Sequence, residues 1–362
     1  MIKKLLDIWH WEINSQRARW IVQIAFFLLV LLVGYKFYLF VEYCESGGTA
    51  KFVERPPGIE AFLPIGALIG IKYFLVTGSV DPVHPAGFII LSTMLLSAFL
   101  FGRGFCSWMC PVGTLSEWLW RAGEKALGKN FRLPTALDWS LRSLKYLMLF
   151  FFIYQILIKM DSGFLVDTFY KHVPYIRVAD VQMMKFFVEM DNATMIVLGV
   201  LLGLSFITKN FWCRYLCPYG AFLGLLWYNN PLSFRVARNE KCIHCGACTR
   251  ACPVLIDVMN DAVVTSPECW HCYDCIKVCP VPGAIEMKLA GRRWDVRYWV
   301  YAFAVVGFFV GMTTYAKYNG HWQTSITTKE YIARVAELDH PKYEHKRGKF
   351  IVEESPPAPQ SD

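Results

Sequence analysis

Long apolar stretches constrain the fold of this chain more than any other feature of its sequence. Five of them approach membrane-spanning length at about 1.5 Å per helical residue. They occupy residues 20–41, 86–101, 141–158, 193–207 and 298–315. Because 55% of the 362 residues are apolar, a helical membrane bundle is favoured over a soluble fold. We therefore predict a mainly α, polytopic bundle of about five spans.

A sixth apolar stretch, residues 59–76, is a weaker candidate for a span. It contains Pro64, glycines and Lys72, which are more typical of a re-entrant or interfacial segment. The first stretch, in contrast, is too long for a signal peptide and lacks a small-residue cleavage site, so we expect an uncleaved helix after a cytoplasmic segment at residues 1–19.

Basic residues predict the orientation of the bundle. The net charge is +8, but the lysines and arginines adjoin the apolar stretches, as the positive-inside rule describes, rather than forming a nucleic-acid site. The rule places the basic connections after the second and fourth stretches in the cytoplasm and the segments 42–81 and 161–191 outside. The polar tail, residues 317–362, is then outside, and its end, SPPAPQSD, is predicted to be disordered.

An internal repeat divides the membrane part into two similar halves. GFCSWMCPVG (104–113) and FWCRYLCPYG (211–220) share the pattern aromatic-Cys-x-x-x-Cys-Pro-x-Gly, and each follows an apolar stretch. We predict duplicated hairpins at residues 20–130 and 131–230, with both cysteine pairs at one membrane face and a pseudo-two-fold axis along the membrane normal.

Two further cysteine motifs follow the repeat. CIHCGACTRACP (242–253) and CWHCYDCIKVCP (269–280) are both C-x2-C-x2-C-x3-C-P, the pattern of bacterial ferredoxins with two clusters, in which the fourth cysteine serves the other cluster. An inserted α+β ferredoxin domain is therefore predicted at 231–292, before a last span at 297–316. One [4Fe–4S] cluster would be bound by Cys242, Cys245, Cys248 and Cys279, and the other by Cys269, Cys272, Cys275 and Cys252.

Zinc is the alternative for these motifs, because C-x2-C pairs also bind zinc. Zinc has no need of four cysteines in this order, repeated, each time before a proline. His244 and His271 lie inside the two motifs, but neither completes a C-x-x-C-H haem attachment sequence. We expect both histidines to be exposed loop residues.

The cysteines of the repeat leave three interpretations open. Cys106 and Cys110, like Cys213 and Cys217, are four residues apart, so each pair can share one face of a helical turn. The four thiols could form a metal or iron–sulfur centre, act as redox-active dithiols, or simply pack. Arg103 and Arg214 lie close by in the sequence and would favour thiolates, which favours a chemical role.

A quinone site would need a proton-handling group near the membrane surface. Asp81 and His84, at the outer mouth of the second span, are candidates, and Lys72 is another. Snorkelling or helix capping is the alternative for each of them.

The order of these motifs resembles the NapH, NosR and MauN group of membrane-bound polyferredoxins, over roughly residues 20–316. The resemblance implies a multi-pass protein of the bacterial inner membrane with a cytoplasmic ferredoxin domain. It also implies electron transfer between the quinol pool and a periplasmic or complex-bound partner, such as a cytochrome or an iron–sulfur protein.

The sequence departs from two branches of such proteins and leaves other functions open. The segment before the first span is too short for the flavin domain of NosR-like members, and the long domain that follows the last span in related copper reductases is missing. One alternative is an assembly factor that reduces copper or disulfides with the Cys-x-x-x-Cys-Pro thiols. Another is a membrane anchor whose clusters stabilise a complex.

Overall fold

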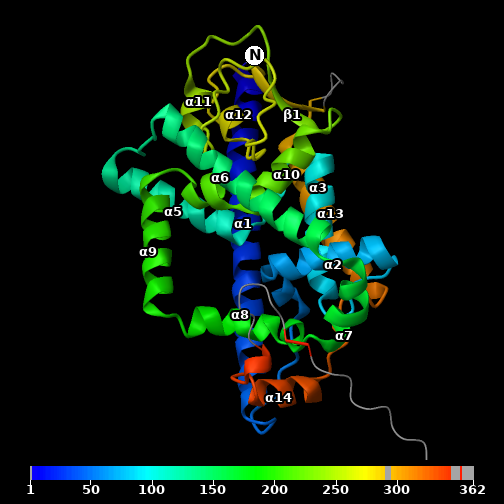
Figure 1. Cartoon of the computed structure of the whole chain (residues 1–362). Helices are drawn as coiled ribbons and strands as arrows, with labels where there is room; N and C mark the ends of the chain where they lie inside the picture. Colours follow the sequence, from blue (N-terminus) through cyan, green and yellow to red (C-terminus); the bar gives the residue numbers. More distant parts are fainter. Residues whose placement is uncertain (1, 290–294, 344–350, 353–362) are drawn as a thin grey trace, which may run out of the picture. The chain divides into compact units, whose positions relative to one another are not determined.

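The computed structural model describes residues 2–289, 295–343 and 351–352, with side chains from residue 16 onward. It is mainly helical, as predicted (Figure 1). The chain forms two compact units that alternate along the sequence. Unit 1 comprises residues 1–30, 93–150 and 192–312, and unit 2 comprises residues 31–92, 151–191 and 313–362.

All five predicted spans are helical, but they differ in length. Three helical segments are long and apolar enough to cross a membrane: residues 16–45 of α1 (Ile2–Glu45), α6 (Thr135–Ile153) continued by the π-helix η2 (Tyr154–Lys159), and α13 (Tyr298–Tyr318). The other two, α3 (Pro85–Phe101) and α9 (Asn192–Ile207), have 17 and 16 residues. Helix α9 follows α8 (Ala179–Val188) at a bend of 77°, and this bent pair would be a fourth candidate span among the described residues.

Residues 59–76 do not form a full-length span. They fold into the short 3-10 helix η1 (Pro57–Phe62) and the 14-residue helix α2 (Pro64–Thr77). Pro64 is the first residue of α2, where its missing N–H is tolerated, and Gly78 ends the helix in a left-handed conformation. At about 1.5 Å per residue, α2 is only about 21 Å long, and a re-entrant or interfacial position for it stays a prediction.

The repeat is visible in local structure within unit 1. In the first copy α4 (Gly104–Trp108) precedes α5 (Pro111–Leu127), and in the second the π-helix η5 (Trp212–Leu216) precedes α10 (Pro218–Tyr228). The second cysteine of each motif caps the new helix: Cys110 Sγ accepts from the Gly113 N–H at 3.5 Å, and Cys217 Sγ accepts from the Gly220 N–H at 3.4 Å. The start of the second helix is therefore built in the same way in both copies, whereas the turn before it is an α-helix in the first copy and a π-helix in the second.

The ferredoxin segment is α+β, as predicted. Strands β1 (Phe234–Arg238) and β2 (Ile285–Leu289) pair antiparallel, with Val236 opposite Met287. The short helices α11 (Ala247–Ala251) and α12 (Asp274–Lys277) lie between them in the sequence and pack on each other. Figure 1 shows these elements beside the start of α1.

Unit 2 is built around a buried ionic cluster that includes part of the tail. Arg55 lies 2.8 Å from Glu60 and 2.7 Å from Asp180, and the Tyr331 hydroxyl donates to Asp180 at 3.0 Å. Tyr331 belongs to α14 (Thr328–Ala336), so residues 317–343 of the predicted polar tail include a packed helix. The SPPAPQSD end lies outside the described residues. The smaller elements of the unit are η3 (Phe164–Phe169), α7 (Tyr170–His172), η4 (Pro174–Arg177) and η6 (Pro341–Tyr343).

Candidate iron–sulfur site

Two cavities in the ferredoxin segment are lined by the two predicted cysteine sets. The first is lined by Cys242, Cys245, Cys248 and Cys279. The second is lined by Cys252, Cys269, Cys272 and Cys275. In each set the fourth cysteine comes from the other motif, because α11 and α12 pack against each other. The structure thus brings together the members of both sets, while their role as ligands stays a prediction.

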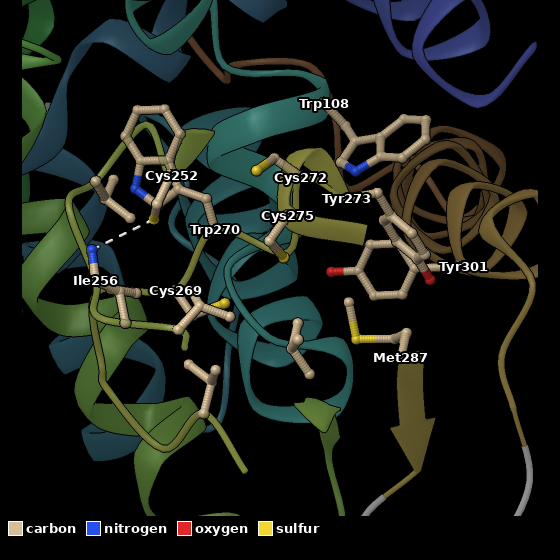
Figure 2. Packing of buried hydrophobic residues seen from close by; sticks show 14 of the residues in the cluster. Trp108, Cys252, Ile256, Cys269, Trp270, Cys272, Tyr273, Cys275, Met287 and Tyr301 are labelled. Carbon is tan, nitrogen blue, oxygen red and sulfur yellow. Dashed lines mark hydrogen bonds between the residues drawn. The ribbon is translucent and has the colours of Figure 1, made fainter. Parts of the chain in front are cut away.

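The two motifs share an unusual backbone conformation. His244 and His271 occupy equivalent positions and have φ angles of 55° and 54°, and two positions further on Gly246 and Tyr273 have φ angles of 72° and 64°. Left-handed residues in such turns let successive amides point to one side. The His244 N–H donates to Cys242 Sγ at 3.4 Å, and the Ile256 N–H donates to Cys252 Sγ at 3.4 Å (Figure 2). Donors of this kind stabilise thiolates and tune the potential of an iron–sulfur cluster.

The second cavity is enclosed by aromatic side chains. Trp108, Trp270, Tyr273 and Tyr301 are each at most 4% exposed and surround its cysteines (Figure 2). Burial raises the pKa of the Cys269 thiol to about 12, so a bound metal would have to displace its proton.

The first cavity is open to water. Cys245 is exposed, Cys242 and Cys279 are partly exposed, and the neighbouring Ile243 is 63% exposed. The two cysteine sets therefore differ strongly in their contact with solvent.

The expectation of two exposed histidines is correct for His244 but wrong for His271. The His271 ring is 1% exposed, stacks on Tyr301 with centroids 5.9 Å apart, and lies within hydrogen-bond distance of the Phe234 carbonyl through Nε2, at 3.0 Å. Burial lowers the pKa of His271 to about 4, so the ring is neutral near pH 7. Nothing in the local sequence distinguishes the two histidines, because only the packing of unit 1 buries the second motif.

The four Cys-x-x-x-Cys-Pro cysteines converge within unit 1. Cys106 and Cys217 both act electrostatically on Cys110, and Cys106, Cys110 and Cys217 all act on Cys213. Burial raises the pKa of Cys110 to about 12. Cys213 is 7% exposed and belongs to the same buried cluster as the cysteines of the second cavity. We call these four residues the cysteine quartet.

One of the two predicted arginines faces the quartet. Arg103 is 1% exposed and interacts with Cys106, and its Nη1 donates to the Pro267 carbonyl at 2.8 Å. Arg214 instead pairs with Asp138 at 2.9 Å and donates to the Val254 carbonyl.

Buried ion pairs beside the second motif were missed from the sequence. Glu268, directly before Cys269, accepts from Lys145 Nζ at 2.6 Å through both oxygens and lies 3.4 Å from Arg103 Nη1. Burial opposes ionisation of Glu268, but Lys145 and Arg103 outweigh it and lower the pKa of the carboxyl. The signal that could have revealed this cluster was Lys145 inside an apolar stretch, because a lysine there requires a partner.

A similar cluster involves α1. Arg19 binds Glu117 through two hydrogen bonds of 2.9 and 2.7 Å and lies 3.5 Å from Asp274, directly before Cys275. Both buried clusters therefore connect a carboxylate beside a cysteine of the second set to an arginine of the helical part of unit 1.

The three quinone-site candidates are buried together in unit 2, mostly with protein partners. Lys72 Nζ donates to the carbonyls of residues 156, 157 and 160. Asp81 accepts from the Val83 and His84 amides at 2.8 Å each and from the Tyr170 hydroxyl at 2.6 Å. His84 Nε2 lies 2.8 Å from the Ile176 carbonyl, and its Nδ1 lies 3.8 Å from Glu60 Oε1. Quinone binding by these residues stays a prediction.

In the parts of the chain that the structure describes, no three His, Cys, Asp or Glu side chains are grouped closely enough to hold a single metal ion.

Apolar helices of spanning length and cysteine-lined cavities define an iron–sulfur electron transport protein with a membrane-type helical bundle. Comparison with protein families agrees with this class. A model described as a 4Fe-4S dicluster domain matches residues 235–280, and one described as a 4Fe-4S binding domain matches residues 83–132 and 192–236, which include the cysteine quartet.

Several curated proteins are similar to the chain. YccM of Escherichia coli, whose name describes an electron transport protein, is 36% identical over 88% of this chain and 89% of its own length. The methylamine utilization ferredoxin-type protein MauN of Methylorubrum extorquens is 30% identical over 49% of the chain and 56% of its length. The regulatory protein NosR of Pseudomonas aeruginosa is 28% identical over 47% of the chain and 23% of its length. No solved structure matches. The chain belongs to the family of ferredoxin-type electron transport proteins that includes YccM, MauN and NosR.

Proposed function

We propose that this protein relays electrons between the membrane quinol pool and a periplasmic or complex-bound redox partner. The observation that carries this proposal is the placement of both cysteine-lined cavities in one compact unit with the cysteine quartet of the membrane repeat. A [4Fe–4S] cluster bound at each cavity would supply one-electron redox chemistry.

The residues that would hold the two clusters are those of the two cavities. The first set is Cys242, Cys245, Cys248 and Cys279, and the second is Cys269, Cys272, Cys275 and Cys252. The chain supports the second set with N–H donors to sulfur and with an aromatic wall that excludes water. Both features act on the stability of negative charge at the site, which sets the reduction potential.

We further propose that the cysteine quartet, Cys106, Cys110, Cys213 and Cys217, holds a third metal or iron–sulfur centre. Buried cysteines kept only for packing need not converge from two copies of a repeat. In addition, the buried Arg103 interacts with Cys106 of the quartet. A buried guanidinium group is expected to face negative charge. Four thiolates at the quartet would provide that charge.

The arrangement in the membrane is part of the proposal. The ferredoxin domain, residues 231–292, would be cytoplasmic, and the tail from residue 317 would be periplasmic, in a bacterial inner membrane. The repeat boundaries 20–130 and 131–230 would describe two duplicated hairpins. This orientation is supported by the basic connections that flank the quartet.

The test is the iron and acid-labile sulfide content of the anaerobically purified protein, with electron paramagnetic resonance before and after addition of a quinol analogue. About eight irons per chain would match two clusters, and more than about eight would support a third iron-containing centre. Reduction of the clusters by quinol supports the relay.

A different outcome would favour the alternative functions. Clusters that respond to low-potential dyes but not to quinol would overturn the quinol relay. If the quartet then transferred copper or reduced a disulfide, the protein would be an assembly factor. If cluster removal affected only the assembly of a complex, the protein would be an anchor.

A further inference from the structure

The two copies of the repeat carry polar side chains at equivalent positions. Arg103 and Asn210 each lie three residues before the first cysteine of their motif, and Ser107 and Arg214 each follow that cysteine directly. All four side chains are buried, and each donates a hydrogen bond to a backbone carbonyl of residues 253–270. Equivalent donors in two copies of a repeat indicate a common role.

The contacts of the first copy lie on either side of Cys269 of the second cysteine set. Arg103 Nη1 donates to the Pro267 carbonyl at 2.8 Å, two residues before this cysteine. Ser107 Oγ donates to the Trp270 carbonyl, directly after it, at 2.8 Å, which is shorter than its 3.3 Å contact within α4. The first copy therefore holds the peptide segment that carries Cys269.

The contacts of the second copy lie directly after Cys252, the cysteine that the other ferredoxin motif adds to the second set. Asn210 Nδ2 donates to the Pro253 carbonyl at 3.0 Å, and Arg214 Nη1 donates to the Val254 carbonyl. The repeat thus holds the second set in both of the motifs that supply it. None of the four carbonyls adjoins a cysteine of the first set.

Arg103 also reaches both halves of the quartet. It interacts with Cys106 in its own copy and acts electrostatically on Cys217 in the other. Its Nη2 lies 2.8 Å from the position that a Cβ would take at Gly220, whose N–H donates to Cys217 Sγ. One buried guanidinium group therefore lies beside both pairs of the quartet and beside the segment that carries Cys269.

We propose that the second cysteine set is the direct electron-exchange partner of the quartet, and that Arg103 is a positioning residue shared by the two. Ser107, Asn210 and Arg214 are positioning residues that hold the second set against the repeat. In each exchange one electron leaves one centre and enters the other, and no bond forms or breaks. The first set, in the cavity that is open to water, exchanges electrons with the quartet only through the second set.

The inference rests on the proposed function, because it requires a redox centre at the quartet and a cluster at the second set. A cation beside two redox centres stabilises an added electron at both of them. Loss of the Arg103 charge should therefore lower the reduction potentials of the quartet centre and of the second set together.

Arg235 offers a matched comparison. This arginine of β1 also acts electrostatically on Cys269, but its guanidinium donates to the carbonyls of residues 228 and 230 rather than to the segment beside the quartet. Its replacement by glutamine should lower the potential of the second set alone.

The test is a redox titration of the cluster-loaded full-length protein in detergent, followed by electron paramagnetic resonance. A water-soluble dysprosium complex assigns the signals, because it broadens that of the exposed first set most. We expect Arg103→Gln to lower both the quartet and the second-set potentials by at least about 59 mV, a tenfold change in a one-electron equilibrium. The potential of the first set should not change.

Magnetic coupling tests the contact without loss of a charge. Reduction of the second set should broaden the signal of the quartet centre, because neighbouring paramagnetic centres interact, and reduction of the first set should not. Ser107→Ala should weaken this broadening at full iron content. Ser116→Ala, which changes another buried serine of unit 1, should leave it as in the parent. If Arg103→Gln loses its clusters, this pair of serine variants decides.

Three results would overturn the inference. One is a fall in only one of the two potentials in Arg103→Gln, and another is a quartet signal that responds to the first set instead of the second. The third is equal behaviour of Ser107→Ala and Ser116→Ala. In each case the third centre is present, so the proposed function stands, and redox mediators make the titration independent of quinol. A parent with about eight irons and no third signal would overturn both the third centre and this inference.

Discussion

Removal of the Glu268 charge should strongly destabilise unit 1. Glu268 is 4% exposed, and it is the carboxylate partner of Lys145 and Arg103, which are 0% and 1% exposed. At an effective dielectric constant of about 20, unit charges 2.6 and 3.4 Å apart attract by about 6 and 5 kcal/mol. Much of this attraction offsets desolvation, so we expect Glu268→Gln to lower the free energy of unfolding by about 3–5 kcal/mol.

Removal of the Lys145 charge should destabilise the protein less than removal of the Glu268 charge. In Lys145→Met, Glu268 keeps Arg103 at 3.4 Å and the Tyr146 hydroxyl at 3.2 Å, so we expect a loss of about 1–3 kcal/mol. The double variant should be more stable than the sum of the single losses predicts, because it removes both buried charges together.

The assay is thermal unfolding in detergent, followed by tryptophan fluorescence, with Glu124→Gln as the control. Glu124 is an exposed glutamate of α5, and its replacement should change stability by less than about 0.5 kcal/mol. If Glu268→Gln unfolded like Glu124→Gln, or if the two single losses simply added, the buried ion cluster would not stabilise the fold as argued.

The same carboxylate gives an expected pH dependence. Its pKa is lowered in the folded protein, so its contribution is fully present above the ordinary glutamate value of about 4.3 and decreases as the pH falls through the lowered value. The difference in stability between the parent and Glu268→Gln should therefore narrow only in acid.

Other substitutions test separate parts of the molecule. Gly123→Ala should destabilise the packing of α5 on α9, because the new Cβ would lie 1.8 Å from the Phe206 carbonyl oxygen. As a control, the Cβ of Gly199→Ala would meet nothing within 4 Å. This variant should be neutral or slightly stabilising in thermal unfolding. Cys106→Ser should lower the iron content per chain, and an unchanged content would contradict a cluster at the quartet. His84→Gln should slow cluster reduction by quinol if Nδ1 meets the quinone head group, and an unchanged rate in stopped-flow measurements would remove His84 from the quinone site.

The sequence by itself determined the local chemistry of the cysteines. Spacing and the proline that follows each ferredoxin motif predicted two sets of four cluster ligands, and each set lines one cavity in the structure. New helices begin at Pro111 and Pro218, directly after Cys110 and Cys217. Features of this kind can be read from the sequence because loop geometry and helix starts depend on a few neighbouring residues.

Span length was only partly predictable. Hydropathy located all five helices, but α3 and α9 are shorter than a full span, and α9 meets α8 at a sharp bend. Apolar composition indicates that a segment avoids water. The length and direction of the helix that it forms depend on the elements packed around it.

Tertiary structure alone decided the environment of each cysteine set. His244 and His271 occupy the same position in similar motifs, yet one is exposed and the other is buried against Tyr301. The contacts of Glu268 with Arg103 and Lys145 join residues more than a hundred positions apart in the sequence. Burial and ion pairing of this kind depend on which distant elements pack together, and local spacing carries no information about that choice.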